Sequence, residues 1–285
     1  MSSSFVSDEQ EKWPAQNFMD VSINIVHYNT PGLLRQTLLS IRRAAPRLNY
    51  EVIVVDNNPQ ARLSDSLRQE FPEMKMIEST NVGFAQGMNK AFEQACGRYL
   101  LVSNPDISML PGSLEKLVEH LDQNPQTGIV GSQLKSPDGS IQSSCYKFTE
   151  PKTVLYRRLP FIKRFAAVKK HLDEYLMVDW DHSDTREVDY LLGACMLIRK
   201  QALDDVSGFD PAFFMYFEEQ DLCRRFWKNG WQVVYHPASV MVHYHRRESA
   251  EGNILQQLLN PVTRHQIRSA RYYFQKYRNE PHPRV

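Results

Sequence analysis

Three carboxylates stand within four positions of the sequence FFMYFEEQDLCRR, residues 213–225. Glu218, Glu219 and Asp221 follow a run of bulky aromatic residues, although charged side chains are seldom buried without a partner. Acidic residues at the start of a helix stabilise the positive end of its dipole, and Asp221 can pair with Arg225 one turn later. The alternative is that one carboxylate acts as a general base toward a hydroxyl group held above the helix.

Two aspartates stand at the ends of predicted buried strands. Asp106 closes the sequence SNPDIS, where Asn104 precedes a proline and is therefore extended. Taken alone, Asn-Pro-Asp favours a turn, and the alternative is a carboxylate that holds a divalent cation against a diphosphate. Asp56, in VVDNN, either forms an Asx-turn or accepts hydrogen bonds from a nucleoside.

A glycine-containing junction precedes a predicted helix. In NVGFAQGMNKA, Gly83 and Gly87 stand near Asn81 and Asn89. A helix N-terminus can bind an anion, but the spacing matches neither a P-loop nor a dinucleotide fingerprint. Read alone, this segment is typical of a structural junction.

Histidines and arginines follow late in the chain. In VMVHYHRRES, His243 and His245 lie on one face of a predicted strand, before Arg246 and Arg247. A lone histidine is more often structural. A histidine that completes an aspartate-anchored metal site, beside arginines that bind a diphosphate, is the more specific hypothesis.

The elements that must position these residues alternate in the first half of the chain. Buried strands are predicted at 21–29, 50–58, 74–79 and 98–106, and helices at 30–44, 83–96 and 110–125. This alternation predicts an α/β fold with a parallel sheet covered on both faces, whose ligands bind at the carboxyl ends of the strands. The polar residues expected there are His27, Tyr28, Asn29, Asp56, Asn58, Asn104 and Asp106.

The second half of the chain breaks the alternation. Strand-like segments at 128–134, 139–145, 188–199, 231–237 and 239–245 have few helices between them, which predicts a mixed, partly antiparallel continuation. A helix is expected from Glu218 to Gly230, and the last 25 residues predict a basic C-terminal helix.

Composition narrows the class of protein. The chain has 285 residues, is 42% hydrophobic and carries a net charge of +1, which argues against a dedicated nucleic-acid binder. Its four cysteines lack metal or redox spacing, so reduced thiols and a cytoplasmic location are expected. No apolar run is long enough to span a bilayer, and the first 20 residues do not resemble a signal peptide.

The near-neutral charge conceals one basic segment. Residues 152–172 carry seven Lys or Arg and no acid, interspersed with leucine, isoleucine and phenylalanine. Such a segment either covers the core as a solvated helix or lies on the headgroups of an anionic membrane.

The order of these motifs resembles the inverting family 2 glycosyltransferases with the GT-A fold, in their rhamnosyltransferase-like branch of bacterial surface polysaccharide synthesis. The resemblance covers about residues 21–249. It rests on Asp56, Asn81-x-Gly83, Asn104-x-Asp106, LLGACMLIRK at 191–200, the acidic stretch at 213–225 and His243. It implies a Rossmann-like, mostly parallel nucleotide-binding sheet, continued by a mixed acceptor-side sheet and a C-terminal helix. The domains expected are an arm at 1–20, a transferase domain at 21–249, divided at 127/128 into nucleotide-sugar and acceptor halves, and a basic helical segment at 250–285.

The resemblance also implies roles for the residues. Asp106 and His243 would bind Mg²⁺ or Mn²⁺, and Glu219, or Glu218, would be the catalytic base. The nucleotide-sugar would contact His27, Tyr28, Asn29, Asp56, Asn58, Asn81, Gly83, Asn89, Asn104, Arg246 and Arg247. The acceptor and sugar pocket would include Gly193, Ala194, Tyr216 and Asp221.

Two departures from the family pattern bear on these roles. Asn104 stands where an aspartate is common, so Asp106 must do more of the metal binding, and Glu219 replaces the usual aspartate, so its reach is longer by one methylene. A nucleotidyltransferase or a dinucleotide oxidoreductase would need a glycine-rich loop after the first strand, and HYNTPG is not one. An inactive, glycan-binding relative is the remaining alternative.

Substrates follow only from the resemblance. It favours dTDP-rhamnose as the donor, with UDP-sugars as the alternative, and a saccharide acceptor that could be lipid-linked. Together with the basic segment, it implies peripheral contact with the inner face of the plasma membrane.

Overall fold

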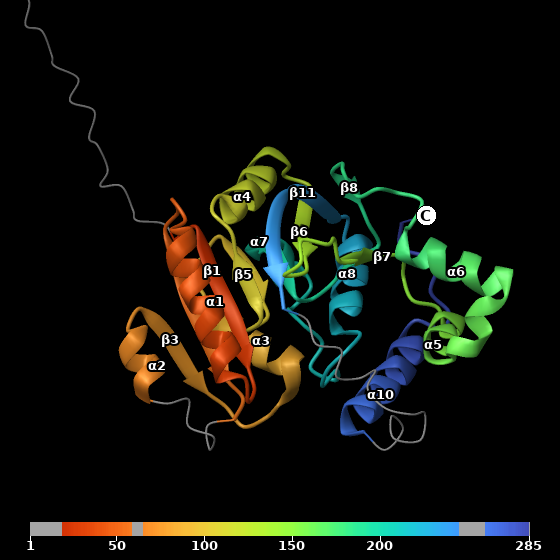
Figure 1. Ribbon diagram of the computed structural model, residues 1–285, viewed down its shortest axis with the longest axis horizontal. Coiled ribbons are helices and arrows are strands. Elements are labelled where there is room, and N and C mark those ends of the chain that lie inside the picture. Colours follow the sequence, from red (N-terminus) through yellow and green to blue (C-terminus); the bar gives the residue numbers. More distant parts are fainter. Residues whose placement is uncertain (1–18, 59–64, 245–259, 285) are drawn as a thin grey trace, which may run out of the picture.

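β-branched runs in the first half of the chain form the parallel part of one sheet (Figure 1). The computed structural model describes residues 19–58, 65–244 and 260–284. The strands pair in the order β3-β2-β1-β4. Their bounds are Val21–His27 for β1, Tyr50–Asp56 for β2, Met74–Glu78 for β3 and Tyr99–Ser103 for β4. In the register of β1 and β2, His27 lies opposite Asp56, so the two predicted binding residues end neighbouring strands.

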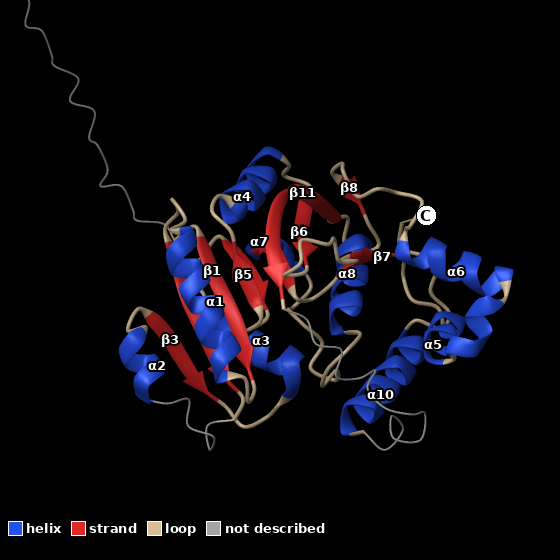
Figure 2. Ribbon diagram, viewed as in Figure 1, coloured by secondary structure: helices blue, strands red, loops and turns tan. Residues whose placement is uncertain are grey.

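Helices cover both faces of this sheet, as the alternation predicted (Figure 2). Leu34, Leu38 and Ile41 of α1 (Pro31–Ala44) pack in one buried cluster with residues of α4 (Ser113–Gln123). On the other face, α3 (Gly83–Glu93) shares a buried cluster with residues of α8 (Glu218–Lys228) and α10 (Pro261–Lys276). A short helix, α2 (Asp65–Glu70), which was not predicted, precedes β3.

The second half extends the sheet in the order β4-β10-β6-β11-β5. These strands are β5 (Ile107–Met109), β6 (Thr127–Lys135), β10 (Cys195–Arg199) and β11 (Gln232–His243). β10 runs antiparallel to both neighbours, β5 and β8 (Arg186–Glu187) run antiparallel to β11, and β6 and β11 are parallel. The prediction of a mixed continuation is confirmed.

Four of the predicted strands differ in detail. Segment 139–145 is mostly irregular, and only Cys145 enters the short β7 (Cys145–Tyr146). Segment 188–199 is split into β9 (Tyr190–Leu191) and β10 by the link that contains Gly193. Segments 231–237 and 239–245 join in the single strand β11, whose pairing with β6 shifts between His236 and Val240, because Pro237 has no N–H group to donate.

The basic segment forms helices, although few were predicted in this half. It folds as α5 (Pro151–Arg158), the 3₁₀ helix η2 (Pro160–Arg164) and α6 (Ala166–Leu176). A further short helix, α7 (Lys200–Asp205), follows β10. The C-terminal basic helix is confirmed as α10, and Figure 1 shows it beside α5. No helix in the described ranges is long and apolar enough to cross a membrane. All four cysteines are free thiols, as predicted.

Candidate active site

The ends of β1 and β2 hold a buried, hydrogen-bonded pair. His27 Nδ1 lies 3.4 Å from Asp56 Oδ1, and the Thr30 N–H group donates to His27 Nε2 at 2.9 Å. Because Nε2 accepts a hydrogen bond, the ring proton belongs on Nδ1, where it can point to Asp56. Burial lowers the pKa of His27, so the ring is neutral at pH 7. Asp56 also accepts from the Asn58 N–H group at 3.0 Å, so its carboxylate is held in one orientation.

Three predicted donor residues surround this pair. The Asn58 side chain donates to Asn29 Oδ1 at 2.6 Å, and Asn29 adopts a left-handed backbone with φ of 56°. The adjacent Tyr28 side chain is 49% exposed. An exposed aromatic ring beside oriented polar groups is suited to contact a nucleobase or sugar.

Gly83 is required by a close backbone approach. Its φ is +85°, and an added Cβ would lie 2.2 Å from the carbonyl oxygen of Phe214. The Phe84 N–H group donates to that carbonyl at 2.7 Å, while Asn57 donates to the Gly83 carbonyl at 3.0 Å. The Gly83 N–H group lies 3.3 Å from Asn81 Oδ1. This junction therefore joins the donor half to the segment before α8.

Asn89 has a structural position rather than one facing a ligand. Its amide donates to the Phe209 carbonyl at 2.8 Å and accepts from the Phe209 N–H group at 2.9 Å. Both ends of the amide are thus used to fix α3 to the loop before α8. The expectation that Asn89 contacts the donor does not agree with these contacts.

The Asn104–Pro105–Asp106 turn is anchored by its main chain. The Thr37 hydroxyl donates to the Pro105 carbonyl at 2.8 Å, and the Tyr244 N–H group donates to the Asp106 carbonyl at 2.9 Å. The Asn104 N–H group donates to the Ala194 carbonyl at 2.8 Å. These hydrogen bonds fix the main chain of the turn, and none of them involves the Asp106 carboxylate.

Asp106 and His243 face one another. His243 Nε2 lies 3.5 Å from Asp106 Oδ1, a buried oxygen that accepts no hydrogen bond from the residues described. His243 Nδ1 lies 2.8 Å from Gln142 Oε1, and the Gln142 amide nitrogen donates to Ser136 Oγ and to the His243 carbonyl. These donations fix the amide orientation, so Gln142 Oε1 accepts the Nδ1 proton and Nε2 is directed at Asp106. No sequence motif indicated Gln142.

This pair fits a divalent cation. A buried carboxylate oxygen and an imidazole nitrogen, the latter oriented by an amide behind it, are suitable ligands for Mn²⁺ or Mg²⁺. The described part of the chain contains no cluster of three such side chains. Because these ions usually complete their coordination with water and substrate phosphates, two protein ligands suit an ion shared with a diphosphate.

The two glutamates at the start of α8 differ in exposure. Tyr216 and Phe217 both have positive φ, 70° and 69°, which is strained backbone for non-glycine residues and is common at functional sites. This turn buries Glu218, which is 6% exposed, and leaves Glu219 partly accessible. An added Cβ on Gly193 would lie 3.2 Å from Glu219 Cβ, so a larger residue there would crowd this side chain.

Burial raises the pKa of both glutamates. That of Glu219 rises to about 7, with the positive charge of Arg157 in α5 partly opposing the rise. That of Glu218 rises well above its ordinary range through burial and the neighbouring Glu219 charge. Glu218 is therefore the harder of the two carboxyl groups to ionise, whereas Glu219 titrates where a general base is most effective. Arg157, whose Nη1 donates to the Tyr175 hydroxyl at 3.2 Å, is a second residue that the sequence did not indicate.

The link Gly193–Ala194 connects the two parts of the site. Ala194 accepts the hydrogen bond from Asn104, two residues before Asp106, and Gly193 faces Glu219, whose Cβ would lie 3.2 Å from a Cβ added to the glycine. The turn that carries Asp106 and the partly exposed Glu219 therefore adjoin the same two-residue link. A ligand that bridges them would place a diphosphate near Asp106 and a hydroxyl near Glu219.

Asp221 and the paired arginines stand apart from this arrangement. Asp221 is fully buried, and its carboxylate contacts Arg225, Lys276 and Tyr277 at 2.6–2.8 Å. Its position is that of an anchor between α8 and α10, which does not agree with a place in the acceptor pocket. Arg246 and Arg247 lie outside the described residues.

Comparison with known proteins supplies an independent result. The profile of Glycosyl transferase family 2 matches residues 22–207. N-acetylglucosaminyl-diphospho-decaprenol L-rhamnosyltransferase of Mycobacterium tuberculosis is 28% identical over 235 residues, which is 77% of this chain and 74% of that protein. Rhamnosyltransferase WbbL of Escherichia coli (strain K12) is 26% identical over 232 residues, 79% of this chain and 83% of that protein.

A solved structure is similar at the level of the fold. The crystal structure of GalNAc-T7 with UDP, GalNAc and Mn²⁺ matches with a TM-score of 0.63 and 14% sequence identity. The match covers 93% of this chain but only 50% of that one, so this chain spans half of its length.

Proposed function

The chain belongs to glycosyl transferase family 2 and has the GT-A fold, and from this premise we propose that it is an inverting, metal-dependent enzyme whose base is Glu219. The observation that carries the proposal is the link Gly193–Ala194, which adjoins both the Asn104–Asp106 turn and Glu219. Glu219, which is partly exposed as a residue and has a pKa of about 7, thus adjoins the same link as the turn that carries Asp106.

The donor half would bind the nucleotide-sugar. Asp56, held by His27 and by the Asn58 N–H group, accepts hydrogen bonds from the nucleoside, and Tyr28 offers an exposed ring. Asp106 and His243 would hold Mg²⁺ or Mn²⁺ against the diphosphate, where the ion neutralises the charge of the leaving group. Gln142 keeps the His243 ring directed at Asp106.

The chemical step is a single displacement. Glu219 removes the proton of an acceptor hydroxyl as that oxygen forms a bond to the anomeric carbon. The bond from the anomeric carbon to the diphosphate oxygen breaks, and its electron pair leaves with the nucleoside diphosphate. Because attack and departure occur on opposite faces of the sugar, the configuration inverts. Glu218 is more deeply buried than Glu219 and its carboxyl group is harder to ionise, so the role of base is given to Glu219.

The donor proposed is dTDP-L-rhamnose. Its support is that two relatives, each matched over more than three quarters of this chain, are named as rhamnosyltransferases. A UDP-sugar is the alternative, and the same residues would bind its diphosphate.

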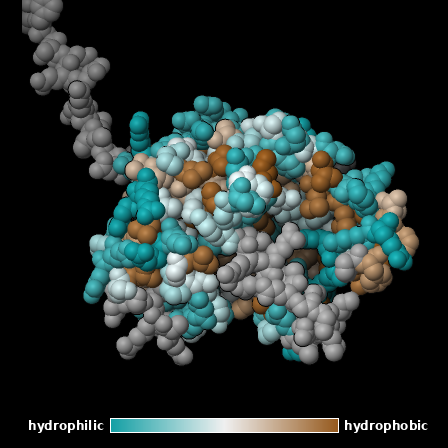
Figure 3. Space-filling view, in the orientation of Figure 1, coloured by the Kyte–Doolittle hydropathy of each residue, from teal (hydrophilic) through white to brown (hydrophobic). Residues whose placement is uncertain are grey.

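The acceptor proposed is a saccharide of cell-surface polysaccharide synthesis, carried on a lipid. The relative from Mycobacterium tuberculosis is named for a decaprenol-diphosphate acceptor. In this chain, Leu155, Phe161 and Phe165 are more than half exposed beside the basic residues of η2 and α6. Figure 3 shows hydrophobic colour at the end of the molecule where Figure 1 places these elements. Peripheral contact with an anionic membrane would place Glu219 near such an acceptor.

A panel of donors tests the enzyme and its specificity together. Thermal unfolding is measured with dTDP-rhamnose and several UDP-sugars, each with Mg²⁺, with Mn²⁺ and with EDTA, and turnover is then measured with the donor that protects best. We expect metal-dependent protection by dTDP-rhamnose and transfer to a lipid-linked saccharide. Protection without turnover on any acceptor would favour an inactive, glycan-binding relative.

Flotation with vesicles tests the membrane contact. We expect salt-sensitive association with anionic vesicles, weakened when Lys163, Arg164, Lys169 and Lys170 are neutralised, because each basic residue near such a surface contributes about 1 kcal/mol. Absence of association at low ionic strength would contradict the membrane contact and leave the transferase proposal standing.

A further inference from the structure

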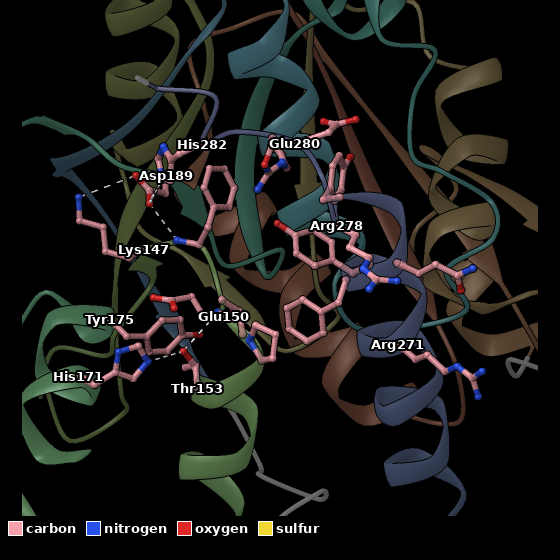
Figure 4. A pocket seen from close by; sticks show the side chains of 18 of the residues that line it. Lys147, Glu150, Thr153, His171, Tyr175, Asp189, Arg271, Arg278, Glu280 and His282 are labelled. Atoms are coloured by element: carbon pink, nitrogen blue, oxygen red, sulfur yellow. Dashed lines mark hydrogen bonds and ion pairs between the residues drawn. The ribbon is translucent and has the colours of Figure 1, made fainter. Parts of the chain in front are cut away.

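A cavity lies away from the residues that were assigned above to the donor, the metal and the base. Its volume is about 970 Å³, at the upper end of the range for small-molecule pockets. One wall is formed by the segment 147–153 with His171 and Tyr175 of α6, and the other by α10 and the residues after it (Figure 4). None of the residues assigned to the donor, the metal or the base lines it.

The carboxylates that line this cavity are already neutralised. Each of the four forms an ion pair with a basic side chain: Glu150 with Lys152, Glu174 with Lys170, Asp189 with Arg284, and Glu280 with Lys228. They therefore contribute little net negative charge to the cavity.

The arginines of the cavity are not neutralised in the same way. Arg271 and Arg278, on the α10 wall in Figure 4, form no hydrogen bond or ion pair with the residues that the structure describes. Arg224 is 7% exposed and forms no ion pair with the described residues. It donates to the Pro281 carbonyl at 2.8 Å, and its Nε is buried without a hydrogen-bond partner in the described ranges. The cavity therefore carries positive charge without a matching acid.

Aromatic rings supply the remaining surface. Phe148, Tyr273, Phe274 and Tyr277 line the cavity, and the Arg224 guanidinium lies 4.5 Å from the ring centre of Tyr277. Arginine favours anions that accept two hydrogen bonds at once, above all phosphates, while aromatic rings bury apolar chains or the faces of sugars. The lining thus suits a molecule with a phosphate and an apolar part.

The cavity is joined to the base through α8. Gln220, the residue after Glu219, exchanges two hydrogen bonds with Thr149 of the cavity wall, and Arg224 lies one turn further along the same helix. A ligand bound here would therefore contact the helix whose first turn carries Glu219.

We propose that this cavity is a second ligand site, which binds an amphipathic molecule through its phosphate, and, resting on the proposed transferase function, that this molecule is the acceptor substrate. The arginines Arg224, Arg271 and Arg278 contact the phosphate, and the aromatic residues contact the part attached to it.

Calorimetric titration with geranyl diphosphate tests the site directly. The protein carries Asp106→Ala and the buffer contains EDTA, so that the diphosphate cannot bind at the donor edge. We expect saturable binding that weakens about tenfold or more in Arg271→Gln/Arg278→Gln, because charge-assisted hydrogen bonds to phosphate are lost. The matched control is Arg43→Gln/Arg47→Gln, two exposed arginines of the opposite half, which should bind as the parent does.

Two further probes test the contributions of the phosphate and of the apolar part separately. Geraniol lacks the anion and inorganic pyrophosphate lacks the apolar part, so both should bind at least about tenfold more weakly than geranyl diphosphate. Pyrophosphate that binds equally well, no binding of geranyl diphosphate, or binding unaffected by the arginine substitutions would each overturn the proposal. Because the titration needs neither donor nor turnover, its failure would leave the transferase proposal intact, and failure of transfer would leave the measured binding intact.

Discussion

The donor edge and the base region are built in different ways. At the donor edge, His27, Asp56 and Asp106 stand at or just beyond the ends of strands β1, β2 and β4, which pair directly. The base region is assembled from Arg157, Gly193 and Glu219, which belong to segments separated by tens of residues. A regular sheet brings the first set together by its register alone, whereas the second set depends on how helices pack on that sheet.

The two regions also differ in how their polar groups are satisfied. Asp56 is held by a histidine and a backbone N–H group, as a binding residue must be to present one orientation. Glu218 and Glu219 each retain a buried oxygen without a hydrogen-bond partner among the described residues, and burial raises the pKa of both. The burial of these two carboxyl groups therefore lowers the stability of the folded protein. The same burial raises their pKa values, so that a carboxylate in the base region can accept a proton.

Removal of the Asp106 carboxylate should have the largest effect. Asp106→Ala deletes one of the two proposed metal ligands, so we expect metal-dependent donor binding to be lost, as measured by thermal protection with Mn²⁺ and dTDP-rhamnose. His243→Ala should weaken the same protection. Undiminished activity of the wild-type protein in excess EDTA would contradict the metal role.

Replacement of the base comes next. Glu219→Gln keeps the shape of the side chain but cannot accept the proton, so we expect kcat to fall about a hundredfold or more while donor protection survives. Glu218→Gln, its neighbour, should retain most of the activity because Glu218 is buried and its raised pKa disfavours the ionised form that a base needs. The reverse result would assign the base to Glu218.

The same variant should not be less stable than the wild type at pH 8. The folded protein raises the pKa of Glu219 from its ordinary value of 4.5 to about 7. A raised pKa favours folding at low pH, and this contribution is lost as the pH rises through about 7. Glutamine carries no charge to desolvate, so Glu219→Gln should unfold at an equal or higher temperature at pH 8. A large decrease would mean that its loss of activity reports misfolding.

This contrast explains what could be predicted from the sequence. His27, Asp56 and Asp106 could be identified because each stands at or just after the end of an apolar run, and such runs predict buried strands whose carboxyl ends meet. Glu219 was named only through its place in a family pattern. That place also favoured it over Glu218, and the structure adds their difference in exposure, which the turn at Tyr216 and Phe217 determines.

Residues that act through another residue could not be predicted. Gln142 lies in a segment with the alternation of a strand, but it is irregular and reaches His243 across about a hundred positions of the chain. Asn89 and Asp221 show the opposite case. Their residue types suit a binding site, but in the structure they hydrogen-bond to Phe209 and Lys276. Such partners are set by tertiary packing, which no local pattern encodes.

Gln142 tests whether the donor edge needs its supporting contact. Gln142→Leu removes the acceptor behind His243 while keeping a similar volume, so we expect metal affinity to fall about tenfold or more, within the range known for such partners. Gln142→Glu restores an acceptor and should recover part of that loss. Equal Mn²⁺ affinity in Gln142→Leu, measured by calorimetry with the donor present, would make the contact merely structural.

The smallest expected effect concerns the charge that Arg157 adds to the base region. Its positive charge lowers the pKa of Glu219, so Arg157→Gln should raise that pKa further above its value of about 7. Because Glu219 must be ionised to act as a base, kcat/KM falls as the pH drops through that pKa, and the variant should lose activity at a higher pH than the wild type. At pH 7 the loss should be less than about tenfold, and at pH 9 activity should approach that of the wild type. Arg157→Lys keeps the charge and should restore the wild-type profile. A loss of equal size at every pH would show instead that Arg157 supports the base region only by packing against Tyr175.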